Sequence, residues 1–266
     1  MTEAKRGRRP PNGEAVLDRA FRLLAAFTEA RPQLTLTELS TITGLPLSTA
    51  SRLSGKLVSL GALERRPDGT FALGLRLLEF AALAPRGHGL RAIALPFMED
   101  LHRATRQHVQ LAVREDGEAV IVERLSATDA ARVLYHVGGR VPLHATGFGM
   151  ILLAHTRPEF QTAYLRRPMP LEPEGTLVDP TELHDRLELI RRTGVTRMTR
   201  LLPEPAASVA APIVDAGRKV VAALSVVGTD GSLDARMLEP AVMAIAASIS
   251  RELGARSRRP PSPAAQ

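Results

Sequence analysis

The sequence has 266 residues, enough for two domains, and its 44% hydrophobic and 24% charged residues are typical of packed globular proteins. It contains no cysteine, which excludes disulfides, zinc–thiolate sites and cysteine nucleophiles. The formal net charge of +7 favours polyanionic partners, and the lack of a signal peptide or of an apolar run of roughly 18 residues predicts a cytoplasmic protein outside the membrane.

The N-terminal region predicts a flexible basic arm followed by a helix. Residues 1–14 combine basic side chains with a proline pair, which is typical of an unstructured arm. Arg31-Pro32 is expected to end the following helix, because the residue before a proline is pushed out of helical geometry. The apolar stripe of this first helix consists of Val16, Leu17, Ala20, Phe21, Leu24 and Phe27.

Two further short helices, separated by a glycine, predict a helix-turn-helix. Thr37 is the expected N-cap of a helix over 38–43, and Gly44 suits a left-handed exit from it. Ser48 is expected to cap the next helix, Thr49 to Leu60. The inner face of that helix comprises Ala50, Leu53, Leu57 and Leu60, and its outer face Ser51, Arg52, Gly55, Lys56 and Ser59. Small polar and basic residues on one face predict a helix that enters a DNA major groove.

A hairpin completes the predicted winged helix-turn-helix domain, 15–74. The segment 63–66 runs into the turn signal Pro67-Asp68-Gly69, and 70–73 returns as the second strand. This wing places basic side chains where they can contact backbone phosphates. The expected DNA contacts are therefore Ser48, Thr49, Ser51, Arg52, Lys56, Arg65 and Arg66. A linker helix and hinge are expected over 75–89.

The remainder, 90–255, mixes helix and hairpin signals. Helices are predicted over 95–107, 147–155, 181–193 and 238–253, hairpins over 109–125 and 208–227, and a strand over 132–137. Hairpins mixed with helices predict an α+β class in which helices cover an antiparallel sheet. The tail, 256–266, is basic and proline-rich and is expected to be disordered.

Several motifs in this order resemble the IclR family of bacterial transcription regulators, over most of the chain. They are Gly44-Leu45-Pro46 with Ser48-Thr49 and Arg52-Leu53, Leu73-Gly74, Pro142-Leu143-His144-Ala145-Thr146 with Gly149, Gly194, and Ala210-Ala211-Pro212. The resemblance implies a winged helix, a dimerising linker helix and a C-terminal GAF-like domain that binds a small effector. It further implies that the protein represses or activates transcription from a palindromic operator in double-stranded DNA, as a homodimer or tetramer.

The resemblance also implies an effector site. Backbone N–H groups of Gly147 and Phe148, at a helix start, would bind the carboxylate of an organic acid, because the N-terminus of a helix attracts anions. The remaining implied site residues are Ser208 and Ser225 on strands, and Val133 and Val141 as apolar wall. The sequence departs from the family pattern at Phe148, Met150, Met198, Leu201, Leu202 and Pro205, which makes the site less polar. A carboxylate with an apolar or aromatic body therefore fits it best.

Catalytic and cofactor motifs are absent from the sequence. The histidines lack metal-site spacing, and neither a P-loop nor a dinucleotide fingerprint is present, so no metal, cofactor or enzyme activity is expected. Ser225 also lacks the surroundings of a nucleophile elbow. Two alternatives to an effector sensor remain open: the second domain could be a catalytic or scavenging binder of small molecules, or an oligomerisation scaffold alone.

Overall fold

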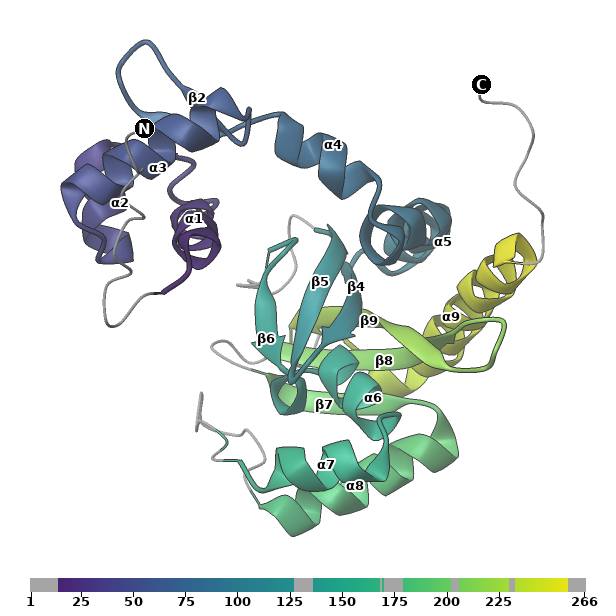
Figure 1. The fold of residues 1–266 in the computed structure, drawn as a ribbon. Helices are drawn as coiled ribbons and strands as arrows, with labels where there is room; N and C mark the ends of the chain where they lie inside the picture. Colours follow the sequence, from purple (N-terminus) through teal and green to yellow (C-terminus); the bar gives the residue numbers. More distant parts are fainter. Residues whose placement is uncertain are drawn as a thin grey trace, which may run out of the picture. The chain divides into compact units, whose positions relative to one another are not determined.

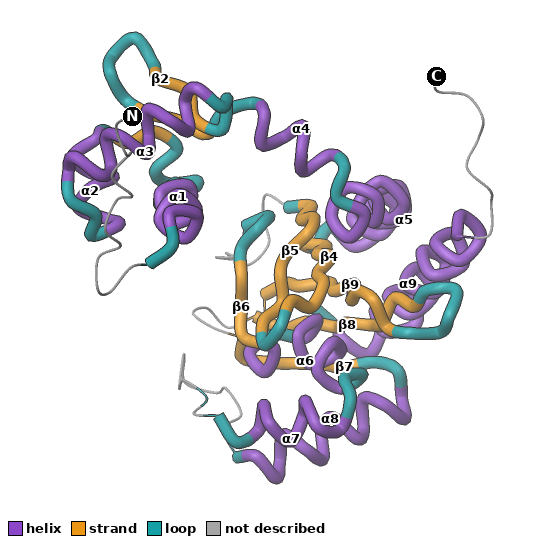
Figure 2. Tube along the Cα trace, viewed as in Figure 1, coloured by secondary structure: helices purple, strands orange, loops and turns teal. Residues whose placement is uncertain are grey.

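The computed structural model describes residues 14–126, 136–167, 169, 179–201, 206–229 and 233–257. The chain divides into two compact units, Met1–Leu83 and Ala84–Gln266, whose elements are drawn in Figures 1 and 2. The described elements of the first unit are α1 (Val16–Leu24), β1 (Gln33–Leu34), α2 (Leu36–Thr43), α3 (Leu47–Ser59), β2 (Leu63–Arg65), β3 (Phe71–Leu73) and α4 (Arg76–Ala82). The boundaries of the predicted linker segment, 75–89, stay a prediction.

The first unit packs α1, α2 and α3 on a small antiparallel sheet with the order β1-β3-β2. Its core is aliphatic with two phenylalanines, as expected of a chain with 3% aromatic residues. The most deeply buried members are Leu23, Leu34, Leu39, Ala50, Leu53 and Leu63. The hairpin β2–β3 is the predicted wing, and the predicted helix-turn-helix with its left-handed Gly44 is also confirmed.

The start of α2 corrects the predicted cap. Thr35, rather than Thr37, is the N-cap: its hydroxyl accepts from the Glu38 backbone N–H at 3.2 Å, and its own N–H donates to the Glu38 carboxylate at 2.7 Å. This reciprocal pair is a capping box, and the Thr-x-x-Glu spacing was its sequence signal. The backbone and hydroxyl hydrogen bonds from Thr35 lower the pKa of Glu38. Ser48 is not a cap either, because α3 begins at Leu47 after Pro46, without a side-chain cap.

The first helix differs from its prediction in length and in orientation. It ends at Leu24, well before Arg31-Pro32. Three members of the predicted apolar stripe face solvent: Val16, Leu17 and Phe21 are 50%, 72% and 70% exposed. Leu23 supplies the fully buried contact of α1 instead. Helical spacing identifies residues that share a face, but it does not say which face the rest of the fold covers.

The second unit is built on a six-stranded antiparallel sheet with the order β6-β5-β4-β9-β8-β7. Its strands are β4 (His108–Glu115), β5 (Glu118–Leu125), β6 (Arg140–Pro142), β7 (Thr196–Leu201), β8 (Ala206–Val214) and β9 (Val220–Thr229). Its helical elements are the π-helical turn η1 (Pro85–Gly89), α5 (Leu90–Thr105), the 3-10 turn η2 (Leu143–Ala145), α6 (Gly147–Ala154), α7 (Pro158–Leu165), α8 (Pro180–Thr193) and α9 (Ala235–Ser257). The predicted α+β class, with helices covering an antiparallel sheet, is confirmed.

The two faces of this sheet are covered by different helices (Figure 1). Alternate residues such as Leu111, Val209 and Val226 pack with α5 and α9 in one apolar cluster. Their neighbours Ala112, Ala210 and Ala223 pack with α6 and α8 in a second cluster. Small residues on the second face allow α6 to lie close to the strands, and all eight residues of this helix are buried.

Several elements were not predicted or are placed differently. The short strands β1, β6 and β7 and the helix α7 had no prediction, and α5 begins at Leu90, so that Pro96 lies inside it. Most of the strand predicted over 132–137 lies outside the described residues, and His136 and Val137 are not in a strand. Helix α9 continues through Ser257, into the tail predicted from 256. Within the described ranges, no helix is long and apolar enough to cross a bilayer.

Candidate nucleic-acid interface and ligand-binding site

The outer face of α3 carries the predicted DNA contacts. Ser48, Ser51, Arg52 and Lys56 are exposed, and Thr49 is half-buried. The buried face consists of Ala50, Leu53, Ser54 and Leu57, whereas Leu60, predicted to point inward, is 45% exposed. The amphipathic pattern thus anchors α3 by its apolar side and leaves its basic side to solvent. The role of these side chains in binding DNA stays a prediction at this point.

The wing adds two arginines, Arg65 at the end of β2 and Arg66 in the turn that follows. Asp68 fixes this turn by accepting from the Thr70 hydroxyl at 2.6 Å and from its N–H at 3.0 Å, and these bonds lower the pKa of Asp68. The Arg65 guanidinium lies 5.9 Å from the centre of the Phe71 ring. Within the part of the chain that the structure describes, no carboxylate forms an ion pair with Arg52, Lys56, Arg65 or Arg66. Their charges are available to phosphate.

The second candidate site lies at the start of α6. The Thr146 hydroxyl caps this helix by accepting from the Gly149 N–H at 3.1 Å. The N–H groups of Gly147 and Phe148 are in the first turn and therefore have no acceptor within the helix. Both residues are buried, so a ligand at this end would meet N–H groups and the positive end of the helix dipole in a dry environment.

Ser208 lies beside this helix start, and Ser225 lies one strand further along the sheet; the role of both in binding an effector stays a prediction. A Cβ added to Gly147 would be 2.6 Å from the Ser208 Oγ and 3.4 Å from the Ala210 Cβ, which places the helix start directly over β8. Ser225 on β9 is opposite Ala210 in the strand register. Ser208 and Ser225 are 1% and 0% exposed, and neither hydroxyl has a hydrogen-bond partner. Buried hydroxyls are normally paired, so both indicate a missing partner.

The remaining predicted effector residues do not have unpartnered polar side chains at the helix start. Val141 on β6 and Phe148 on α6 are 2% and 1% exposed and belong to the apolar cluster beneath the helix. Val133 lies outside the described residues. Sequence reasoning missed Gln110 on β4, which is opposite Ser225 in the register and 1% exposed, with an unpartnered Nε2. A glutamine between the apolar residues of a buried strand was the available signal.

Two interactions from α7 hold α6 and its preceding turn in place. The Tyr164 hydroxyl lies 2.8 Å from the His144 Nδ1 and accepts from the His144 backbone N–H at 3.3 Å, and burial raises the pKa of Tyr164. At the other end of α6, the Gln161 amide donates to the carbonyls of Leu153 and Ala154, each at 3.0 Å. The helix start is therefore fixed rather than adaptable.

In the described ranges, no three His, Cys, Asp or Glu side chains gather as a metal site.

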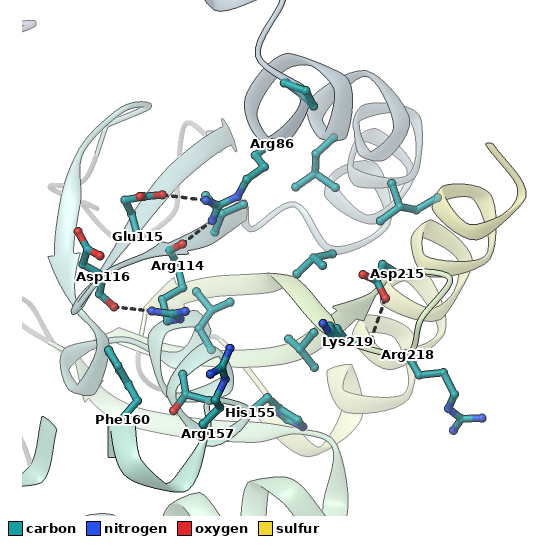
Figure 3. Close-up of a pocket in the computed structure, with 18 of the residues that line it drawn as sticks. Arg86, Arg114, Glu115, Asp116, His155, Arg157, Phe160, Asp215, Arg218 and Lys219 are labelled. Carbon is teal, nitrogen blue, oxygen red and sulfur yellow. Dashed lines mark hydrogen bonds and ion pairs between the residues drawn. The ribbon is translucent and has the colours of Figure 1, made fainter. Parts of the chain in front are cut away.

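A separate groove of about 1250 Å³ lies where the turns β4–β5 and β8–β9 approach the start of α7 (Figure 3). Arg114 stacks 4.8 Å from the centre of the Phe160 ring and donates to the Asp116 carbonyl at 2.7 Å. Arg86 pairs with Glu115 at 2.9 Å across its edge. Among the described residues, none of those predicted to bind an effector lines this groove. Of its described charged side chains, only Arg86 and Glu115 form an ion pair with each other.

The fold and these sites define a class of protein: a winged helix-turn-helix DNA-binding protein with a separate α+β domain. Residues 16–67 match the family described as the IclR helix-turn-helix domain, and residues 83–252 match the family described as the bacterial transcriptional regulator IclR C-terminal domain. The chain belongs to the IclR family of bacterial transcriptional regulators, which bind DNA through the helix-turn-helix.

Relatives match along nearly the whole chain. The HTH-type transcriptional regulator KipR of Bacillus subtilis is 32% identical over 84% of this chain and 91% of its own length. The transcriptional repressor IclR of Escherichia coli is 30% identical, over 92% and 94%. An IclR homolog from Microbacterium hydrocarbonoxydans, crystallised in complex with 4-hydroxybenzoate, is 36% identical, with a TM-score of 0.85 over 91% of this chain and all of that one. The Bacillus and Escherichia relatives are transcriptional regulators.

Proposed function

We propose that the protein regulates transcription from a palindromic operator and that a small organic acid, bound beside the start of α6, modulates its affinity for DNA. Ligand binding is supported mainly by the buried, unpartnered hydroxyls of Ser208 and Ser225 near the N–H groups at the start of α6. DNA binding is supported mainly by the exposed face of α3, whose basic side chains form no ion pairs with the described residues, within a winged helix of the IclR family.

The proposed effector is a carboxylate with an apolar or aromatic body. Its carboxylate would accept from the Gly147 and Phe148 N–H groups and from Ser208, because an anion is favoured at a helix N-terminus. The apolar cluster around Phe148 and Ile151 would surround its body. The related Microbacterium protein, which was crystallised with the aromatic acid 4-hydroxybenzoate, supports this class of ligand.

The proposed mechanism is a shift between populations. The protein acts as a homodimer or tetramer, and its paired recognition helices read two half-sites related by two-fold symmetry. An acid that binds one arrangement of the subunits more tightly than another shifts the population toward it. The spacing of the recognition helices, and hence the affinity for the operator, changes as a result.

Replacing Arg52 by alanine is expected to weaken operator binding about 10- to 100-fold, because a specific contact to a base is worth about 1–3 kcal/mol. The measurement is fluorescence anisotropy on a duplex that the wild-type protein selects from random DNA. Arg251→Ala, which removes the same charge from an exposed position in the other unit, is the control and should leave the affinity within about two-fold. An Arg52→Ala protein with unchanged affinity and footprint would reject the role of this side chain.

A panel of aliphatic and aromatic carboxylates tests the effector. An acid present at a hundred times its dissociation constant should stabilise the protein by about 2.7 kcal/mol, which is readily seen in thermal unfolding. Ser208→Ala should reduce the shift without lowering the stability of the free protein, because its hydroxyl has no partner to lose. The same acid should change the affinity for operator DNA that the anisotropy titration measures. If no acid alters either measurement, the second unit serves assembly alone or its ligand lies outside the carboxylates, and the proposed sensing of an organic acid is wrong.

A further inference from the structure

A row of hydrogen-bonding groups crosses three strands beneath the start of α6. In the antiparallel register, Gln110 on β4 is opposite Ser225 on β9, and Ser225 is opposite Ala210 on β8. Residues opposite each other in an antiparallel pair point to the same face of the sheet. Ser208, two residues from Ala210 on β8, shares that face as well. Since Gly147 lies over Ser208 and Ala210, the row runs from the helix start toward Gln110.

The groups in this row have one property in common: each can donate a hydrogen bond. The Gln110 Nε2 can only donate, and so can the backbone N–H groups of Gly147 and Phe148, whereas the hydroxyls of Ser208 and Ser225 can donate or accept. The Gln110 Nε2 and the hydroxyls of Ser208 and Ser225 are all buried and lack partners. A carboxylate at the helix start satisfies the groups at one end of the row. It leaves the Gln110 amide unpaired, two strands away.

We infer that Gln110 selects effectors that carry a second oxygen acceptor at the end remote from the carboxylate. This inference rests on the proposed function of the site. Neighbouring strands are about 4.8 Å apart, so β8 and β4 are separated by about 10 Å. The effector class is therefore an elongated acid with an oxygen at each end, such as a para-hydroxylated aromatic acid or a dicarboxylate. A hydroxyl, carbonyl or second carboxylate oxygen accepts from the Gln110 amide, beside Ser225.

A role in stabilising the fold does not account for Gln110. An amide that stabilises a core does so by making hydrogen bonds, as the Gln161 amide does with two carbonyls of α6. The Gln110 Nε2 makes none, and an unsatisfied buried donor is destabilising. Replacing Gln110 by methionine, which has a similar shape without the N–H donors, should therefore leave the melting temperature of the ligand-free protein unchanged or higher. A structural glutamine would give the opposite result.

Calorimetric titration of the full-length protein with two matched pairs of acids tests the inference. The pairs are 4-hydroxybenzoate with benzoate, and adipate with hexanoate. The wild-type protein should prefer the member with the second oxygen about 10- to 100-fold, the range set by leaving one buried donor unpaired. Gln110→Met should reduce that ratio to near one while the affinity for the simpler acid is unchanged or higher. Ser208→Ala should weaken both members of a pair equally.

Ser54→Ala is the matched control, because it removes another buried, unpartnered hydroxyl, from the N-terminal unit. It should leave every ratio unchanged. Acids that bind without preference for the second oxygen, or a preference that survives Gln110→Met, would overturn the inference and leave the effector site standing. A melting temperature lowered by Gln110→Met would also count against it. If neither pair binds the wild-type protein, both the effector site and the selection by Gln110 are wrong.

Discussion

Replacing Gly74 by alanine should destabilise the N-terminal unit by about 3 kcal/mol or more, a large loss of stability for one added methyl group. The variant should also lose DNA binding. A Cβ at this position would lie 2.1 Å from the Gly61 carbonyl oxygen and 2.8 Å from its carbon. Both atoms belong to the backbone, so no side-chain rotation relieves the clash. The Gly74 N–H also donates to the Ala62 carbonyl at 2.9 Å, which holds the wing against the end of α3.

Urea unfolding followed by circular dichroism, together with anisotropy on operator DNA, measures this effect. Gly55→Ala is the control for stability only, because Gly55 lies on the face of α3 predicted to contact DNA: no atom lies within 4 Å of its added Cβ, and alanine in the interior of α3 should stabilise the helix by about 0.5–1 kcal/mol. Ligand binding by the C-terminal unit should persist in Gly74→Ala. A Gly74→Ala protein that unfolds like the wild type would mean that the close approach of the two backbone segments is wrong.

Replacing Gly147 by alanine should weaken carboxylate binding about 100-fold. The added methyl group would lie 2.6 Å from the Ser208 Oγ, so that the helix start and the Ser208 side chain would have to move apart. The acid then loses charge-assisted hydrogen bonds of about 1.5–3 kcal/mol. The clash should also lower the melting temperature of the free protein, because Ser208 is short and buried and has little room to move. Calorimetry with the carboxylate that gives the largest thermal shift measures the loss of affinity.

The double variant Gly147→Ala/Ser208→Ala separates the clash from the loss of binding. Without the Ser208 Oγ, the nearest atoms to the new methyl group are the Ala210 Cβ at 3.4 Å and the Cβ of residue 208 at 3.6 Å, which are ordinary contacts. The melting temperature should recover to that of Ser208→Ala, whereas carboxylate binding should stay weaker than in Ser208→Ala alone. Recovery of binding in the double variant would show that the acid does not occupy the space beside Gly147.

Much of the DNA-binding unit could be predicted from local sequence. The left-handed Gly44, the division of α3 into buried and exposed faces, and the turn of the wing depend on residues close together in the chain. The errors have local causes as well. The cap was assigned to Thr37 although Thr35 has glutamate at the capping-box spacing, and a cap was assigned to Ser48 although Pro46 already precedes the helix.

The sequence by itself determined the class of this protein, because the winged helix and the apolar, amphipathic helices follow from spacing that the chain carries locally. The tertiary structure alone decided which faces are covered: Val16, Leu17 and Phe21 of the predicted apolar stripe are exposed, and Gln110 is buried opposite Ser225. Strand order and register join segments far apart in the sequence, and local periodicity does not specify them. The proposed ligand site depends on such pairings, since Gly147, Ser208 and Gln110 come to lie along one face of the sheet only when α6 packs on it.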